Sequence, residues 1–121
     1  MSKPECKVSA DGSKWWYLNG NLHREGGPAV EYANGDKCWY LNGKLHRKDI
    51  NPETGLTMPA IEYSNGEKFW YLNGKLHRKD GPAVELVDGG TEYYINGKHI
   101  TQLDNKRIYG KESLQKFLLL I

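Results

Sequence analysis

The sequence predicts an all-β protein that forms an elongated antiparallel meander of repeated β-hairpins. Three observations support this prediction: a period of about 23 residues, turn signals that occur twice in each period, and apolar or aromatic runs on both sides of the turns. The chain of 121 residues also contains 14 glycines, 8 tyrosines and 4 tryptophans. Glycines among many aromatic residues are typical of short strands joined by tight turns.

The repeat is marked by the tetrapeptide Tyr-Leu-Asn-Gly, which begins at Tyr17, Tyr40 and Tyr71 and returns as Tyr-Ile-Asn-Gly at Tyr94. The steps between these tyrosines are 23, 31 and 23 residues. The longer step contains eight extra residues, the insert at 50–57, and removing them restores the register. A fixed period of this length is typical of stacked repeats.

We expect one repeat domain that covers residues 1–121, because a chain of this length fits a single domain. The insert is expected to bulge out as a loop and to leave the sheet intact. The last segment, 101–121, is expected to cap the array. The four units are expected at approximately 7–28, 29–58, 59–81 and 82–100.

Apolar residues at helical spacing predict a short capping helix near the C-terminus. They are Leu114, Phe117, Leu118 and Ile121, and Ser113 is a candidate N-cap. Such a helix would cover the unpaired edge of the last strand, because terminal repeats need a cap.

Turn chemistry sets the expected pairing of the strands. Asn-Gly and Asp-Gly supply the positive φ angles of a two-residue type I′ turn. The turn at 34–35 is therefore expected to pair Val30 with Trp39, and the next turn is expected to pair Tyr40 with Leu45.

Alternation along the strands then sorts the side chains onto two faces of the sheet. The more apolar face is expected to form the core, and the mixed face is expected to contain the contact surface. The core face is expected to carry Val30, Tyr32, Trp39, Leu41 and His46. The contact face is expected to carry Ala29, Glu31, Cys38, Tyr40, Leu45 and Arg47.

The run Trp-Tyr-Leu-Asn-Gly-Lys-Leu-His resembles the MORN repeat, in which a tryptophan precedes Asn-Gly-Lys and a histidine follows the glycine by three residues. The chain continues with His-Arg and later Gly-Pro-Ala where MORN units have His-Gly-x-Gly, and this variant resembles a MORN-like subfamily of tailed phages and large viruses. The resemblance covers roughly residues 10–100 and implies a twisted single-layer sheet. The matching positions are Trp39, Gly43 and His46, and Trp70, Gly74 and His77.

The resemblance and the small size imply a non-enzymatic protein-binding module. We expect a phage-encoded inhibitor or adaptor of a host defence protein, because small phage proteins without enzyme motifs often block host proteins. The sequence has no Walker loop and no nucleophile elbow, so we expect no enzyme activity and no cofactor.

Residues that recur once per unit are the candidate contacts with a partner. Tyrosine is enriched at interfaces because its body is apolar and its tip is polar. The arginine after each histidine would either pair across strands with a repeated glutamate or form a ladder that grips phosphates. The insert would supply specificity. The candidate partner-binding residues are Tyr17, Tyr40, Tyr71, Tyr94, Arg24, Arg47, Arg78, Asn51 and Glu53.

The histidines also recur, at His23, His46, His77 and His99. Their spacing along the array does not bring them together as a tetrahedral metal site requires, so we expect no metal. We expect each imidazole to pack against a cross-strand tryptophan and to donate to a turn carbonyl.

Composition gives the expected surroundings and partners. The net charge of +2 does not indicate nucleic acid. Cys6 and Cys38 occupy non-equivalent repeat positions, which favours a reduced, cytoplasmic setting. No apolar segment suggests a signal peptide or a membrane span. We therefore expect a protein partner from the host, and neither nucleic acid nor a membrane.

Two further functions remain open from the sequence. One is a sponge for a phosphorylated small ligand, such as a nucleotide signal, held between neighbouring arginines. The other is a self-associating structural scaffold, a homodimer joined through the apolar C-terminal end at 118–121.

Overall fold

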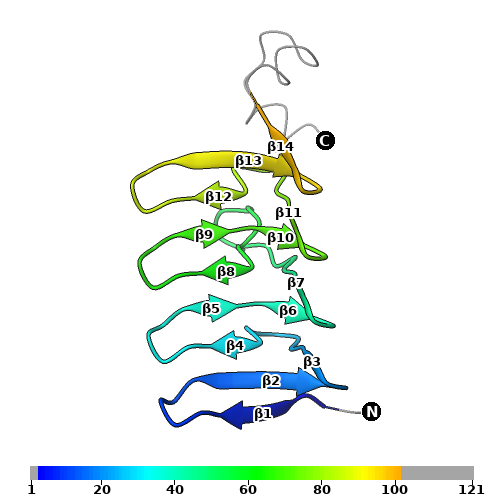
Figure 1. The fold of residues 1–121 in the computed structure, drawn as a ribbon. Helices are drawn as coiled ribbons and strands as arrows, with labels where there is room; N and C mark the ends of the chain where they lie inside the picture. The colour runs from blue at the N-terminus through cyan, green and yellow to red at the C-terminus, as the bar shows by residue number, and fades with distance from the viewer. Residues whose placement is uncertain (1–2, 102–121) are drawn as a thin grey trace.

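The structure is a computed structural model that describes residues 3–101, and this part of the chain folds into fourteen short β-strands without any helix (Figure 1). The strands are β1 (Glu5–Val8), β2 (Lys14–Leu18), β3 (Asn21–Leu22), β4 (Val30–Glu31), β5 (Lys37–Cys38), β6 (Tyr40–Leu41), β7 (Lys44–Leu45), β8 (Ile61–Glu62), β9 (Lys68–Phe69), β10 (Tyr71–Leu72), β11 (Lys75–Leu76), β12 (Val84–Glu85), β13 (Thr91–Ile95) and β14 (Lys98–Ile100).

The strands form one ten-stranded antiparallel sheet with two hairpins beside it. The sheet runs β1-β2-β4-β5-β8-β9-β12-β13-β14, with β3 paired to β2, and the pairs β6-β7 and β10-β11 are the separate hairpins. Figure 1 shows the units stacked one above another, from β1 at one end to β14 at the other. The predicted all-β meander of hairpins is confirmed. The predicted C-terminal helix lies outside the described residues.

The first class of turn has the predicted type I′ geometry. Asn19, Asn42, Asn73 and Asn96 have φ angles of 49–51°, and the glycine after each also has a positive φ. Asparagine tolerates this left-handed conformation better than other side chains. Tyr40 consequently pairs with Leu45 as predicted.

The second class of turn contains one more residue than predicted. At the Asn34-Gly35 turn only the glycine has a positive φ, 99°, and Tyr32 N–H donates to the carbonyl of Asp36 at 2.9 Å. This is a three-residue loop in which the glycine takes the left-handed position. Val30 therefore pairs with Cys38, and the predicted pairing of Val30 with Trp39 is wrong.

The shifted register changes which side chains share a face. One face, called here the valine face, carries an apolar row along the sheet and the tyrosines of the Tyr-Leu-Asn-Gly motifs. The opposite face, called here the tryptophan face, carries one tryptophan from each of the first three units and a ladder of alternating charges. The apolar row is Trp15, Val30, Cys38, Ile61, Phe69 and Val84. The charge ladder is Lys14, Glu31, Lys37, Glu62, Lys68 and Glu85.

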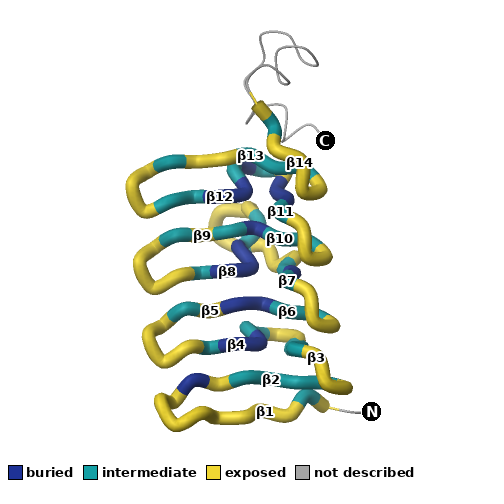
Figure 2. The backbone as a smooth tube through the Cα atoms, viewed as in Figure 1, coloured by how far each residue is buried: buried dark blue, intermediate teal, exposed yellow. Residues whose placement is uncertain are grey.

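The core is small and lies near the middle of each rung, while the turns at both ends are exposed (Figure 2). Val30, Cys38 and Ile61 form a buried cluster against which the half-buried Tyr40 and Tyr71 pack. Burial raises the pKa of the Cys38 thiol to about 11, so this thiol is protonated at neutral pH.

The insert leaves the sheet intact, as predicted. Strands β5 and β8 flank it in the sequence and pair directly, with Cys38 opposite Ile61. The insert closes on itself through an isolated bridge between Ile50 and Thr57 and a hydrogen bond from Asn51 N–H to the carbonyl of Leu56 at 2.8 Å.

Candidate functional site

An arginine covers a tryptophan ring in each of the first three units. The charge of a guanidinium is attracted to the face of an indole ring, and the stacked pair also buries apolar surface. The distances from the guanidinium carbon to the ring centroid are 3.7 Å for Arg24 and Trp16, 3.7 Å for Arg47 and Trp39, and 3.9 Å for Arg78 and Trp70.

Each of these arginines is also bound by oxygen atoms of its own chain. Arg78 Nη1 donates to Glu85 at 3.1 Å and to the carbonyl of Pro82 at 3.0 Å, and its Nε donates to Asp80 at 2.8 Å. Arg47 makes the same three kinds of contact. The predicted cross-strand pairing with glutamate is therefore present. Through these hydrogen bonds each arginine links the tryptophan that it covers to the turn that contains Gly-Pro or Met-Pro.

Exposure of the arginine side chains falls along the array. It is 30% for Arg24, 9% for Arg47 and 6% for Arg78. The two inner guanidinium groups therefore offer little free surface to a partner.

The predicted tyrosine contacts lie on the other side of the sheet. Tyr40 and Tyr71 are half-buried on the valine face, and burial raises the pKa of both hydroxyl groups. Tyr17 is also half-buried, with Lys7 Nζ 5.3 Å from its ring centroid, and the Tyr94 ring lies 5.0 Å from that of His99. The expectation that tyrosines and arginines share one face is thus wrong, because the arginine folds back over the tryptophan that precedes each tyrosine.

Aromatic side chains continue across the exposed part of the valine face. Tyr32 and Tyr63 are 38% and 39% exposed. Tyr32 meets Trp15 edge to face, with the ring centroids 5.2 Å apart, and Tyr63 meets Phe69 in the same way at 5.6 Å. The centre of the same face is buried: Val30 is 1% exposed, and Leu22 and Leu45 pack against its cluster with Cys38 and Ile61.

The insert is anchored to the third unit. Thr57 donates its backbone N–H and its hydroxyl to the carboxylate of Asp80, both at 2.7 Å, and its carbonyl accepts the indole N–H of Trp70 at 3.0 Å. At the tip, the side-chain carbonyl of Asn51 accepts the N–H of Glu53 at 2.8 Å, so Asn51 shapes the loop while Glu53 is exposed.

The histidines connect successive units. The Nδ1 atoms of His23, His46 and His77 accept the backbone N–H of an asparagine in the next unit, each at 2.9 Å. The expected donation to a carbonyl is wrong, because the neighbouring turn presents an N–H. Burial lowers the pKa of His46 and His77, and the nearby charges of Lys48 and Lys79 lower them further.

His99 is not equivalent to the other three histidines. It pairs with Tyr94, so it occupies the position of Leu45 in the second unit, and Ile100 takes the histidine position. The spacing of 22 residues from His77 to His99, instead of 23, was the sequence signal for this difference.

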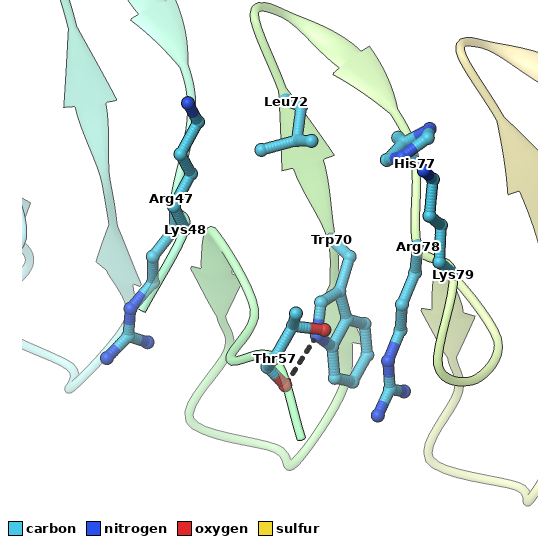
Figure 3. Close-up of a pocket in the computed structure, with 8 residues that line it drawn as sticks. All are labelled: Arg47, Lys48, Thr57, Trp70, Leu72, His77, Arg78 and Lys79. Atoms are coloured by element: carbon cyan, nitrogen blue, oxygen red, sulfur yellow. Dashed lines mark hydrogen bonds between the residues drawn. The ribbon is translucent and has the colours of Figure 1, made fainter. Parts of the chain in front are cut away.

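Three equivalent cavities lie in a row on the tryptophan face, one in each of the first three units. Each is lined by the tryptophan, leucine, histidine and arginine of its own unit. The third has a volume of about 350 Å³, and Trp70, Leu72, Thr57 and two lysines contribute to its lining (Figure 3). The sequence interpretation missed these lysines, Lys48 and Lys79, although both directly follow a repeated His-Arg pair.

Comparison with protein-family models, curated proteins and solved structures gave no match to this chain. In residues 3–101 no helix could cross a membrane, and no three side chains of the metal-binding types are grouped closely enough to hold an ion.

Proposed function

We propose that the chain is a MORN-like repeat module that binds a protein partner without catalysing a reaction. The observation that carries this proposal is the pair of exposed tyrosines on the valine face, Tyr32 and Tyr63, each of which packs edge to face on a further aromatic ring. Aromatic side chains that are exposed together on one face are candidates for an interaction site. Tyrosine and tryptophan are also the residues that most often dominate the energy of protein interfaces.

The shape of the face suits a partner with a flat or gently curved surface. Trp15 lies on β2 and Phe69 on β9, while Tyr32 and Tyr63 directly follow β4 and β8, so the four rings share one face of the hydrogen-bonded sheet. These rings are held in edge-to-face pairs, so they would lose little conformational entropy when a partner binds. The four motif tyrosines extend the same surface and remain candidate contacts.

The sequence variant supports a host protein as the partner, since the repeat resembles that of phage and large-virus proteins. An inhibitor or adaptor needs only a stable surface, and the fastened tryptophan face would keep such a surface rigid. The insert is anchored on the opposite side, where it contacts Trp70 and Asp80. The insert would therefore contribute contacts on the tryptophan face rather than on the valine face.

The test is affinity capture with the tagged chain from cells that naturally express it, followed by titration of the purified partner. Tyr32→Ser combined with Tyr63→Ser should weaken binding by about 2 kcal/mol, roughly 30-fold, because two exposed aromatic contacts are removed. Both side chains are more than one-third exposed, so the far-ultraviolet circular dichroism spectrum should not change.

The control variant carries Lys37→Gln and Lys68→Gln on the tryptophan face. It should bind the captured protein with the wild-type affinity. Equal binding by the tyrosine variant, or loss of binding in the lysine variant alone, would show that the valine face is not the interface.

A further inference from the structure

The third cavity differs in charge from the second, although both have the same apolar lining. Trp70 and Leu72 contribute the apolar surface of the third cavity, and no carboxylate is among the described residues that line it (Figure 3). The second cavity is lined by Glu25 and Asp49 as well as by basic residues. An anion would therefore meet two negative charges in the second cavity and none at the lining of the third.

One repeat position accounts for most of this difference. The residue after the repeated arginine is Glu25 in the first unit, Lys48 in the second and Lys79 in the third. The second cavity lies between Glu25 and Lys48, and the third lies between Lys48 and Lys79. The third is thus the cavity with a lysine on both sides.

The insert accounts for the rest of the difference. Asp49 is 60% exposed and lines the second cavity, whereas its counterpart Asp80 is 16% exposed. Thr57 binds both carboxylate oxygens of Asp80 at 2.7 Å. The insert therefore engages this carboxylate, which is not among the residues that line the third cavity.

Lys48 offers a ligand a charge that is more accessible than those of the two arginines. The guanidinium groups of Arg47 and Arg78 already donate to two carboxylates each. Lys48 is exposed and makes no ion pair within residues 3–101. This revises the expectation that neighbouring arginines would hold a phosphate.

We propose that the third cavity binds a small phosphate monoester, with its phosphate between Lys48 and Lys79 and its apolar body against Trp70 and Leu72. A phosphate monoester carries a charge of about −1.5 to −2 at neutral pH, which matches two ammonium groups better than a single carboxylate does. The volume of about 350 Å³ suits a small molecule. The site lies on the tryptophan face and is independent of protein binding through the valine face.

The indole N–H signals of the four tryptophans provide the test, recorded in ¹⁵N-labelled protein at low ionic strength. Phenyl phosphate and AMP serve as probes, and phenol and adenosine are their uncharged counterparts. Either phosphate should shift the Trp70 signal saturably, while Trp15 and Trp16 stay unchanged. The uncharged compounds should produce no saturable shift at the same concentrations.

Matched lysine variants assign the site. Lys48→Gln combined with Lys79→Gln should weaken the affinity for the bound probe roughly tenfold, since two charge contacts are lost. Lys44→Gln combined with Lys75→Gln removes the same charge from equivalent exposed positions outside the cavity and should change the affinity less than about twofold. The proposal fails if neither phosphate shifts Trp70 saturably, if Trp39 responds as strongly, or if the first variant binds like the wild type.

Discussion

In the third unit the buried guanidinium of Arg78 lies close to the backbone of a glycine. A Cβ atom at Gly81 would lie 2.6 Å from Cζ of Arg78, and one at Gly27 would lie 3.0 Å from Cζ of Arg24. The guanidinium therefore fits between the Trp70 ring and the glycine backbone. In the second unit Met58 precedes the proline instead, and Nη2 of Arg47 lies 3.5 Å from the Met58 sulfur.

Replacing this glycine should consequently destabilise the fold. Gly81→Ala should lower the free energy of unfolding by about 2 kcal/mol, because overpacking a filled site costs about 1–3 kcal/mol. Gly27→Ala should cost less, because the Arg24 side chain is 30% exposed and has room to move. Urea denaturation of both variants at pH 7 measures the difference, and a larger loss for Gly27→Ala would contradict this account.

Part of the arginine site could be predicted from the sequence. Pairing of the repeated arginine with the repeated glutamate was one of two alternatives, and the structure contains it. The stacking on tryptophan could not be predicted from alternation, because Arg47 would then point away from Trp39. Strand β7 ends at Leu45, before Arg47, so strand alternation does not fix the direction of this side chain, and its guanidinium lies over the Trp39 ring.

At the scale of elements, the insert is an addition to a complete repeat. Deleting 50–57 and replacing Met58 by glycine would recreate the sequence His-Arg-Lys-Asp-Gly-Pro-Ala that the third unit already has. The shortened chain should fold, because β5 and β8 pair without help from the insert. Its far-ultraviolet circular dichroism spectrum should match that of the wild type.

The shortened chain should nevertheless melt at a lower temperature. It loses the two hydrogen bonds from Thr57 to Asp80 and the one from Trp70 to the Thr57 carbonyl. A hydrogen bond contributes about 1 kcal/mol net, so a loss of about 2–3 kcal/mol is expected. Thermal denaturation measures it, and an unchanged or higher melting temperature would mean that the anchoring contributes nothing.

The two classes of turn show where sequence reasoning failed at this scale. Both contain Asn-Gly, but the side-chain carbonyl of Asn34 accepts the N–H of Asp36 at 3.0 Å, which suits a three-residue loop. No such contact forms at the type I′ turns, where the asparagine itself has a positive φ. The extra residue places the motif tyrosines on the same face as Val30 and the tryptophans on the opposite face, where Trp39 and Trp70 are nevertheless buried.

For the whole molecule, the histidines make the contact between successive units sensitive to pH. His46 and His77 must be neutral at Nδ1 to accept an N–H from the next unit. Their pKa values are lowered below 6.5 in the folded chain, so the unfolded chain binds protons more readily. Their contribution to stability is complete above about pH 6.5 and is lost as the pH falls toward the folded pKa.

The melting temperature should therefore fall between pH 7.5 and pH 5.5. Over this range Asp80 remains ionised: burial alone would raise the pKa of its carboxyl, but the hydrogen bonds from Thr57 and Arg78 and the charge of Arg78 together lower that pKa from 3.8. Replacing both His46 and His77 by glutamine removes the titrating groups and should flatten the dependence. A melting temperature that is the same at both pH values in the wild type would contradict the role assigned to these imidazoles.

Within residues 3–101, the hydrogen bonds between successive units, from an asparagine N–H to the histidine of the preceding unit, are not continued beyond the fourth unit. Each of the first three units offers an imidazole acceptor to its successor, but the fourth has Ile100 at that position and Tyr93 in place of the tryptophan. A further copy of the unit would find no acceptor there, whereas a copy inserted between existing units would meet the same joint on both sides. This joint can thus be repeated between the existing units, whereas Ile100 cannot provide it for a following unit.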